Sequence, residues 1–143
     1  MGSASTGRLP PPHGTLARWA WDFVLATDAR AKLDPPAPPL EAESAWETDA
    51  PVRRLEAPGR PPEWTVVLRH ARTPSAASLV HAVNRAKLAL TFAHHEVQAG
   101  ELMAWAILAF PGTPREFQVG LARLALDEAR HARTYVEHAR ALG

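Results

Sequence analysis

The distribution of proline constrains the fold of this chain more than any other feature. The 143 residues include 14 prolines, yet none lies between Ser75 and Phe110 and none follows Pro114. Proline removes a backbone donor and clashes with the preceding helical turn, so long helices are expected only where it is missing. Alanine and leucine, which favour helix, dominate both proline-free stretches. The sequence therefore predicts a helix of about 35 residues over 75–110 and another of about 27 residues over 114–141.

The link between these two predicted helices is the short sequence PGTP, Pro111 to Pro114. Thr113 followed by Pro114 suits a helix start, because threonine caps the first turn and proline is tolerated at the first helical position. Two long helices joined by so short a link must fold back on each other. We therefore expect an antiparallel helical hairpin over residues 74–143.

The upstream part divides into three predicted segments. Residues 1–13 are expected to be a flexible N-terminus. Helical spacing of apolar residues predicts one helix over 14–33, capped by Thr15 and stopped by prolines at 35 and 36. Residues 34–73 hold eight prolines, which exclude a continuous helix or a central strand. We expect this segment to wrap a surface with Trp46 and Trp64 as anchors, and disorder is the alternative. The expected fold class is all-α.

Composition limits the function. Hydrophobic residues make up 46% and charged residues 22%, which favours a folded core, and the net charge of +1 with dispersed arginines argues against a nucleic-acid surface. No apolar run reaches the ~18 residues of a membrane span. The lack of cysteine excludes disulfides and thiolate sites and fits a cytoplasmic location.

The second predicted helix carries a stripe of residues spaced by four and three that should face the core. Glu128 and His131 lie on it as Glu-x-x-His, so that a carboxylate and an imidazole one turn apart can meet one metal ion. Burying a carboxylate in such a stripe is costly without a cation or hydrogen bonds. The stripe consists of Phe117, Leu121, Leu124, Glu128, His131, Tyr135 and His138.

The first predicted helix has a matching stripe whose only charged residue is Glu96. It consists of Ala82, Ala86, Ala89, Ala93, Glu96, Gly100, Met103, Ile107 and Phe110. Glu96, Glu128 and His131 are therefore the candidate metal ligands. Glu101 lies about 140° around the helix from Glu96, on a stripe expected to be polar or partly exposed with His94.

Five neighbours are candidates to support these ligands. Asp127 could accept a hydrogen bond from a metal-bound imidazole while Arg130 holds the Asp127 carboxylate in place. The alternative is that Asp127 and Arg130 form a surface ion pair. Tyr135 is expected to pack in the core, with a radical site or a hydrogen-bond donor as alternatives. His95 is either an outer supporting group or an exposed histidine. Glu101 is expected to be solvated or to support the site.

At this point the sequence resembles a known family. The segments HHEVQAGELMAWAILAF and FQVGLARLALDEARHARTYVEH, with AKLDPP and GRPPE upstream, resemble the bacterial ferritin-like family catalogued as domain of unknown function 455. Its pattern reads approximately His-x-Glu-x-Gln-Ala-x-Glu-Leu and then Asp-Glu-x-x-His. The matching residues here are His94, Glu96, Gln98, Ala99, Glu101, Leu102, Asp127, Glu128 and His131. The Glu-x-Gln-Ala segment is also similar to the first iron-binding helix of rubrerythrin-like proteins, which places the ligand at Glu96.

The resemblance implies a four-helix ferritin-like bundle with a di-iron centre, or a manganese one, of which this chain forms the N-terminal half. In that family a second half carries another Glu and another Glu-x-x-His, and neither occurs before the chain ends at Gly143. Three resolutions are open: a homodimer, a second polypeptide with the other half-site, or a truncated, metal-free remnant.

Two classes of function follow. Carboxylates and imidazoles with open coordination positions suit a di-iron oxidase or oxygenase that acts on an unknown small-molecule substrate. The alternative is a non-catalytic helical dimerisation or binding module. Iron storage is disfavoured, because nothing in the sequence indicates a cage-forming exterior.

Overall fold

The computed structural model describes residues 8–64 and 73–143. Within these ranges the secondary structure is helical, with four α-helices, two short 3-10 helices and no strand. The α-helices are α1 (Leu16–Leu25), α2 (Ala29–Leu33), α3 (Ala82–Ala109) and α4 (Arg115–Ala141), and the 3-10 helices are η2 (Glu43–Ala45) and η3 (Ala76–Val80). The all-α prediction is confirmed for the described residues.

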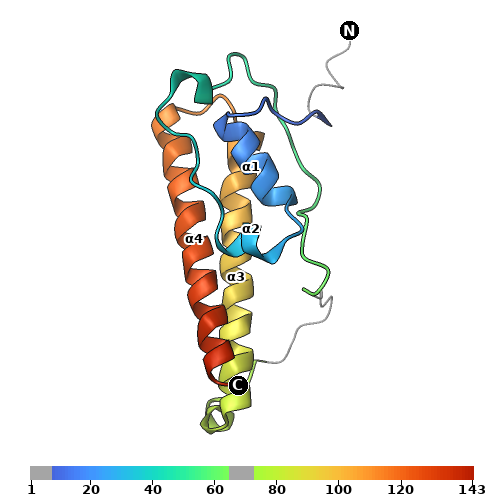
Figure 1. The fold of residues 1–143 in the computed structure, drawn as a ribbon, viewed down its shortest axis with the longest axis vertical. Coiled ribbons are helices and arrows are strands. Elements are labelled where there is room, and N and C mark those ends of the chain that lie inside the picture. Colours follow the sequence, from blue (N-terminus) through green and yellow to red (C-terminus); the bar gives the residue numbers. More distant parts are fainter. Residues whose placement is uncertain (1–7, 65–72) are drawn as a thin grey trace.

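Helices α3 and α4 form an antiparallel hairpin and run side by side over most of their length (Figure 1). Small residues allow them to approach closely. A Cβ atom added to Gly100 would lie 3.4 Å from the carbonyl oxygen of Ala125, which is ordinary van der Waals contact. Eight of the buried small residues of the two helices form what we call the alanine seam: Ala89, Ala93, Gly100, Ala104, Ala122, Ala125, Ala129 and Ala132.

The first predicted hairpin helix begins later than expected. Residues 76–80 form η3, which Ser75 caps by accepting a hydrogen bond from the backbone of Ser78. His81 then takes an extended backbone, with ψ at 127°, and α3 starts at Ala82. The sequence has no proline at this break, so proline spacing could not reveal it.

The predicted single helix over 14–33 is wrong, because the chain turns at Ala26 and forms α1 and α2 separately. Ala26 has ψ at 135°, and Asp28 caps α2 by accepting a hydrogen bond of 2.8 Å from the backbone of Arg30. The turn brings the Lys32 ammonium group back to the end of α1. There it donates to the carbonyl oxygens of Phe23 and Val24, at 2.8 and 2.7 Å. The predicted cap Thr15 is confirmed, since its side chain accepts from the backbone of Arg18.

Helix α1 packs on one face of the hairpin and forms the core with it. Its buried residues contact the turn-proximal half of α3 and α4, and the indole of Trp19 donates to the carbonyl oxygen of Pro36 at 2.7 Å. The opposite ends of α3 and α4 extend beyond the N-terminal elements (Figure 1). The core cluster comprises Leu16, Trp19, Ala20, Phe23, Val24, Ala104, Ile107, Leu108, Leu121, Ala122 and Ala125.

The proline-rich segment wraps this core, as predicted, over its described part. Leu40, Trp46 and Leu55 pack against the core cluster, and the Trp105 indole donates to the carbonyl oxygen of Leu55 at 3.0 Å. Trp64 is half-buried. The part of the predicted segment from residue 65 to residue 72 lies outside the described residues.

The N-terminus was expected to be flexible over 1–13, of which residues 1–7 lie outside the described ranges. Residues 8–13 are instead held in place. Pro11 is buried, and its carbonyl oxygen accepts from Arg18 at 3.2 Å, while the carbonyl oxygen of Leu9 accepts from Arg53 at 3.2 Å. Two arginines that reach back from later segments thus fix this stretch.

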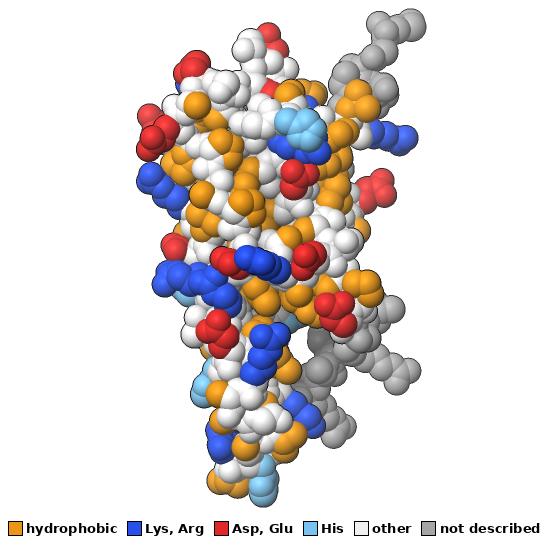
Figure 2. Space-filling model, viewed as in Figure 1, with side chains coloured by type: hydrophobic (Ala, Val, Ile, Leu, Met, Phe, Trp, Pro, Cys, Tyr) orange, Lys and Arg blue, Asp and Glu red, His pale blue; other side chains and the backbone are white. Residues whose placement is uncertain are grey.

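Charges of both signs are interspersed on the face drawn in Figure 2. None of the helices in the described ranges combines the length and the apolar character that crossing a membrane requires.

Candidate metal centre

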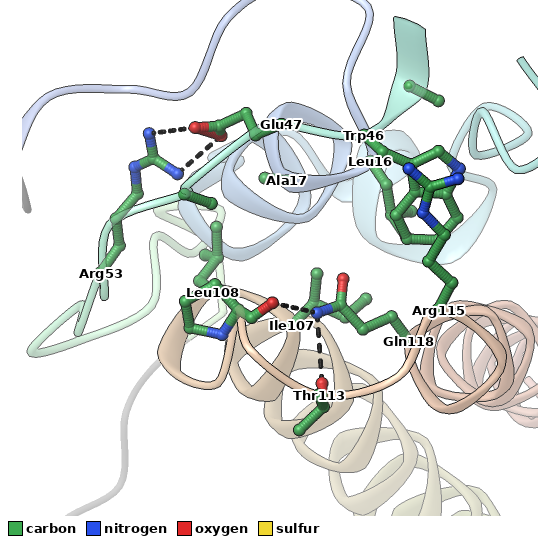
Figure 3. A pocket seen from close by; sticks show the side chains of 13 residues that line it. Leu16, Ala17, Trp46, Glu47, Arg53, Ile107, Leu108, Thr113, Arg115 and Gln118 are labelled. Carbon is green, nitrogen blue, oxygen red and sulfur yellow. Dashed lines mark hydrogen bonds and ion pairs between the residues drawn. The ribbon is translucent and has the colours of Figure 1, made fainter. Parts of the chain in front are cut away.

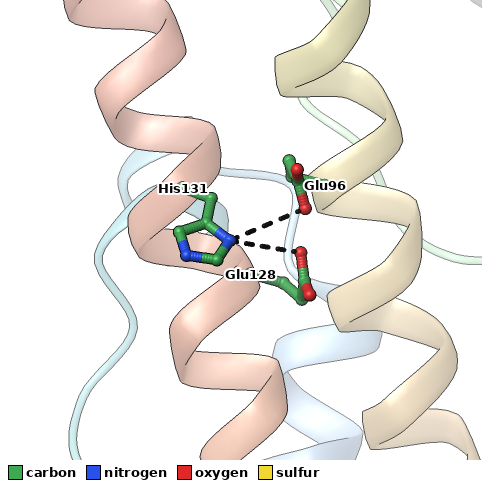
Figure 4. Close-up of side chains that lie close together, drawn as sticks. All are labelled: Glu96, Glu128 and His131. Atoms are coloured by element: carbon green, nitrogen blue, oxygen red, sulfur yellow. Dashed lines mark ion pairs between the residues drawn. The ribbon is translucent and has the colours of Figure 1, made fainter.

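The hairpin brings Glu96, Glu128 and His131 together near the middle of both long helices (Figure 4). One ligand atom from each of the three lies within 4.8 Å of the other two. The Nδ1 atom of His131 is 3.9 Å from Glu96 Oε2 and 3.7 Å from Glu128 Oε2. The sequence prediction that these three residues share one place is thus matched by their geometry, and we call them the ligand trio.

These separations fit a shared metal ion better than direct hydrogen bonds. Hydrogen bonds between nitrogen and oxygen are normally shorter than ~3.2 Å. Two ligand atoms that each lie ~2.1 Å from one ion can be at most ~4.2 Å apart. Distances of 3.7 and 3.9 Å are therefore too long for hydrogen bonds and short enough for an ion between them.

The surroundings of Glu128 support the same conclusion. Its Oε2 atom is buried and accepts no hydrogen bond from any residue in the described ranges. A buried carboxylate oxygen without a donor costs free energy, on the order of 1–3 kcal/mol, unless a cation or a proton compensates it. The imidazole nitrogen of His131 and the carboxylates of Glu96 and Glu128 together form a donor set that suits iron or manganese. The residues present thus fit a metal ion.

The ligand trio is open to one side. The side chains of Glu96, Glu128 and His131 are 27%, 22% and 46% exposed. Both predicted stripes were expected to face the core. The α3 stripe does so over Ala89, Ala93, Gly100 and Ile107, which are buried, whereas the prediction is wrong for the α4 stripe, in which only Leu121 is buried. The residues that α4 buries centre on Ala125 and Ala129, so the predicted stripe lies at the edge of the contact between the helices.

Apolar side chains flank the ligand trio on this exposed side. Because Glu96 and Glu128 meet across the two helices, residues four, seven and eleven positions from them along each helix lie on the same face. The large apolar ones are Phe92 and Met103 of α3 and Phe117 and Leu124 of α4, and with the ligand trio we call this surface the open face. Phe92, Phe117 and Leu124 are between 41% and 53% exposed.

Four predicted supporting residues do not touch the trio in any described contact. Asp127 pairs with Arg130 at 3.2 Å, and both are largely exposed, which matches the surface-pair alternative. His95 is exposed. Tyr135 is half-buried and packs on Phe92, with ring centres 5.4 Å apart, so it lies on the open face and not in the closed core.

Glu101 departs most from its prediction, because it is buried and not solvated. Its carboxylate accepts a 2.9 Å hydrogen bond from Lys32 and two more from the guanidinium group of Arg60. Sequence reasoning missed both cations. The indole of Trp105, one turn further on the same stripe, was the available sign that this side of α3 is covered.

Burial sets the ionisation of this cluster. Desolvation lowers the pKa of the Lys32 ammonium group, and the hydrogen bond and charge of Glu101 oppose that shift. Desolvation also lowers the pKa of His94, and the neighbouring Arg60 charge adds to the effect. The Nε2 atom of His94 lies 3.4 Å from nitrogen atoms of both Arg60 and Gln98, so it is placed to accept from them. This cluster ties the upstream segments to the side of α3 that faces α1.

A cavity of about 220 Å³ lies away from the ligand trio, at the turn end of the hairpin (Figure 3). The charged groups that line it are already paired. Arg53 binds both oxygens of Glu47 at 2.8 and 3.0 Å, and Arg115 binds Glu43 while its guanidinium lies over the Trp46 ring. Gln118 donates to the carbonyl oxygen of Pro111 and thereby holds the turn.

The fold and the site define a class of protein: a helical bundle with two glutamates and one histidine gathered on a long hairpin. The family described as "Protein of unknown function (DUF455)" matches residues 24–143, so the chain belongs to that family. No curated protein and no solved structure matches the chain.

Proposed function

We propose that this chain is half of a ferritin-like di-metal carboxylate protein that binds iron, or manganese, through Glu96, Glu128 and His131. The observation that carries the proposal is the buried Glu128 Oε2 atom, which accepts no hydrogen bond from the described residues and lies 3.7 Å from the Nδ1 atom of His131. A carboxylate oxygen in this position is stabilised by a cation. The three residues form half of such a site, and a second copy of the chain is one source of the other half.

The proposed activity is that of an oxygen-activating oxidase or oxygenase with a small-molecule substrate. Bound iron would supply the redox chemistry for reducing dioxygen. The two glutamates supply anionic oxygens, the neutral imidazole of His131 supplies a nitrogen, and the three leave coordination positions free for other groups. The open side of the trio, where His131 is 46% exposed, gives those groups access.

The test of metal binding compares matched glutamate variants. The chain is expressed with added iron and purified without chelator, and its metal content is measured by mass spectrometry. We expect roughly one ion per chain in the wild type, because three ligands converge on one position. Glu128→Ala should lose that ion. Glu116→Ala should keep it, because Glu116 is exposed in the first turn of the same helix.

Equal metal content in the wild type and Glu128→Ala would contradict the proposal. Dioxygen uptake tests the activity: anaerobic protein loaded with Fe(II) is mixed with aerated buffer in an oxygen electrode. The wild type should consume oxygen faster than Glu128→Ala at the same iron concentration, and equal rates would exclude the oxygen-activating function.

A specific observation favours one alternative function. Three large apolar side chains are 41–53% exposed on the open face, and surfaces of this kind mark interaction sites. A non-catalytic helical assembly module would use that face without metal. The metal measurement separates the two functions.

A further inference from the structure

The open face requires a covering partner for two independent reasons. Phe92, Phe117 and Leu124 leave large apolar areas exposed on one surface of the hairpin. The ligand trio at its centre provides two carboxylates and one imidazole, fewer than the ligands that iron or manganese normally takes. The other surface of the hairpin is occupied, since α1 packs on α3 and α2 on α4.

We infer that a second copy of this chain docks on the open face and adds its own Glu96, Glu128 and His131 to those of the first copy. This inference rests on the proposed function. The ligand trio lies near the middle of α3 and of α4. A two-fold axis beside the trio therefore brings the two trios together. In this arrangement the two hairpins lie against each other along their whole length. Closed two-fold pairing of identical surfaces is the commonest form of oligomer.

The ligand chemistry supports a second copy as the occupant. Two trios hold four carboxylates and two imidazoles, and two divalent cations balance four negative charges. An apolar helix from another protein would cover the phenylalanines but would bring no ligand to an ion held by Glu96, Glu128 and His131. Burying an ion with unfilled coordination positions against such a helix is unfavourable.

The size of the face also fits a dimer. A helix of 27 residues is about 40 Å long and two packed helices are about 20 Å wide, so the hairpin offers about 800 Å². A stable interface needs about 800 Å² from each partner, with apolar side chains at its centre and polar groups around it. The open face has the area and the apolar residues that a stable dimer requires.

The test measures molar mass and metal content in the same samples. The full chain is loaded with Mn(II) and analysed by light scattering at several concentrations, alongside Leu124→Glu and the control Val52→Glu. Val52 is 50% exposed in the proline-rich segment, away from the open face. We expect the mass of two chains for the wild type and Val52→Glu, and of one chain for Leu124→Glu, because a new charge at the interface centre opposes docking.

Electron paramagnetic resonance of the Mn(II) samples tests whether the trios meet. Two ions in one shared site lie about 4 Å apart and couple magnetically, so we expect a coupled-pair spectrum in the dimer. The six-line spectrum of isolated ions in a dimer would overturn the inference. A molar mass of one chain with metal bound would also overturn the inference, but it would leave the proposed metal-binding function intact. A dimer that Leu124→Glu disrupts but that binds no metal supports the docking face and overturns the proposed function.

Discussion

Glu101 and Glu128 show how differently two carboxylates are accommodated on one hairpin. Glu101 is buried and accepts hydrogen bonds from Lys32 and Arg60. Glu128 has a buried oxygen that receives no donor from the described residues. A carboxylate that already accepts hydrogen bonds from two cations serves the structure, whereas one with an oxygen that accepts none leaves its charge available for a ligand.

Glu128→Gln should have opposite effects with and without metal. In metal-free protein, replacing the unpaired charge by a neutral amide of similar size should stabilise the fold by about 1 kcal/mol, or raise the unfolding temperature by roughly 3 °C. In protein saturated with Mn(II), the wild type should be the more stable, because only it gains binding free energy. Scanning calorimetry with and without Mn(II) measures both differences. A loss of stability in both conditions would show that Glu128 has a purely structural role.

Lys32→Met should destabilise the fold by about 3 kcal/mol. The substitution removes the donor shared by Glu101 and the carbonyl oxygens of Phe23 and Val24, and it leaves these acceptors buried. Urea denaturation followed by tryptophan fluorescence gives the free energy of unfolding. Lys87→Met is the control, since Lys87 is exposed on α3 and its loss should change stability by less than about 0.5 kcal/mol. Similar values for the two variants would contradict a special role for Lys32.

At the scale of elements, the proline-rich segment is attached to the end of α1 at one close contact. The backbone of Gly59 donates to the carbonyl oxygen of Val24 at 2.9 Å. A Cβ atom at this position would lie only 2.1 Å from the carbonyl oxygen of Leu25. Only glycine therefore permits this approach, and the neighbouring Arg60 depends on it to reach Glu101.

Gly59→Ala should cost about 2 kcal/mol, because a rigid backbone carbonyl must move to make room for the methyl group. Gly112→Ala is the matched control, since nothing lies within 4 Å of the corresponding Cβ position. Its effect should stay within about 0.5 kcal/mol. Chemical denaturation of both variants checks the difference. If the two alanine substitutions cost the same, the close approach of Gly59 does not contribute to stability.

The hairpin could be predicted from the sequence because its signals are local. Proline-free, alanine-rich stretches and the short link at Pro111 to Pro114 define both long helices, and their spacing brings Glu96 beside Glu128. The break at Ala26 could not be predicted in this way. It depends on Lys32 reaching the end of α1 and on Gly59 arriving from another segment, and periodicity within one helix does not encode such contacts.

The sequence also could not predict which side of each long helix is covered by the rest of the chain. A stripe with four- and three-residue spacing shows which residues share a face but not which neighbour covers that face. Here α1 and the proline-rich segment cover the side that holds Glu101 and Trp105. The stripe with Glu128 and Leu124 therefore remains open.

At the scale of the whole molecule, the unfolding temperature should depend on chain concentration. Dissociation accompanies unfolding when a dimer is the folded form, so dilution favours the unfolded state. We expect the unfolding temperature of the Mn(II)-loaded wild type to rise over a hundredfold increase in concentration. Leu124→Glu should show no such rise. Differential scanning fluorimetry at matched metal saturation measures this, and a constant value for the wild type would indicate that single chains unfold.

The alanine seam has a consequence for how freely this sequence can change. At Gly100 a methyl group would already be in van der Waals contact with Ala125 and Glu128, and the neighbouring positions of both helices hold buried alanines. Any larger residue there would push the helices apart and separate Glu96 from its two partners on α4. Random mutagenesis under selection for a folded chain should therefore recover glycine, alanine and serine along the seam. The small size of the residues along the whole seam, and not the strength of any single contact, preserves the distance between Glu96 and its two partners on α4.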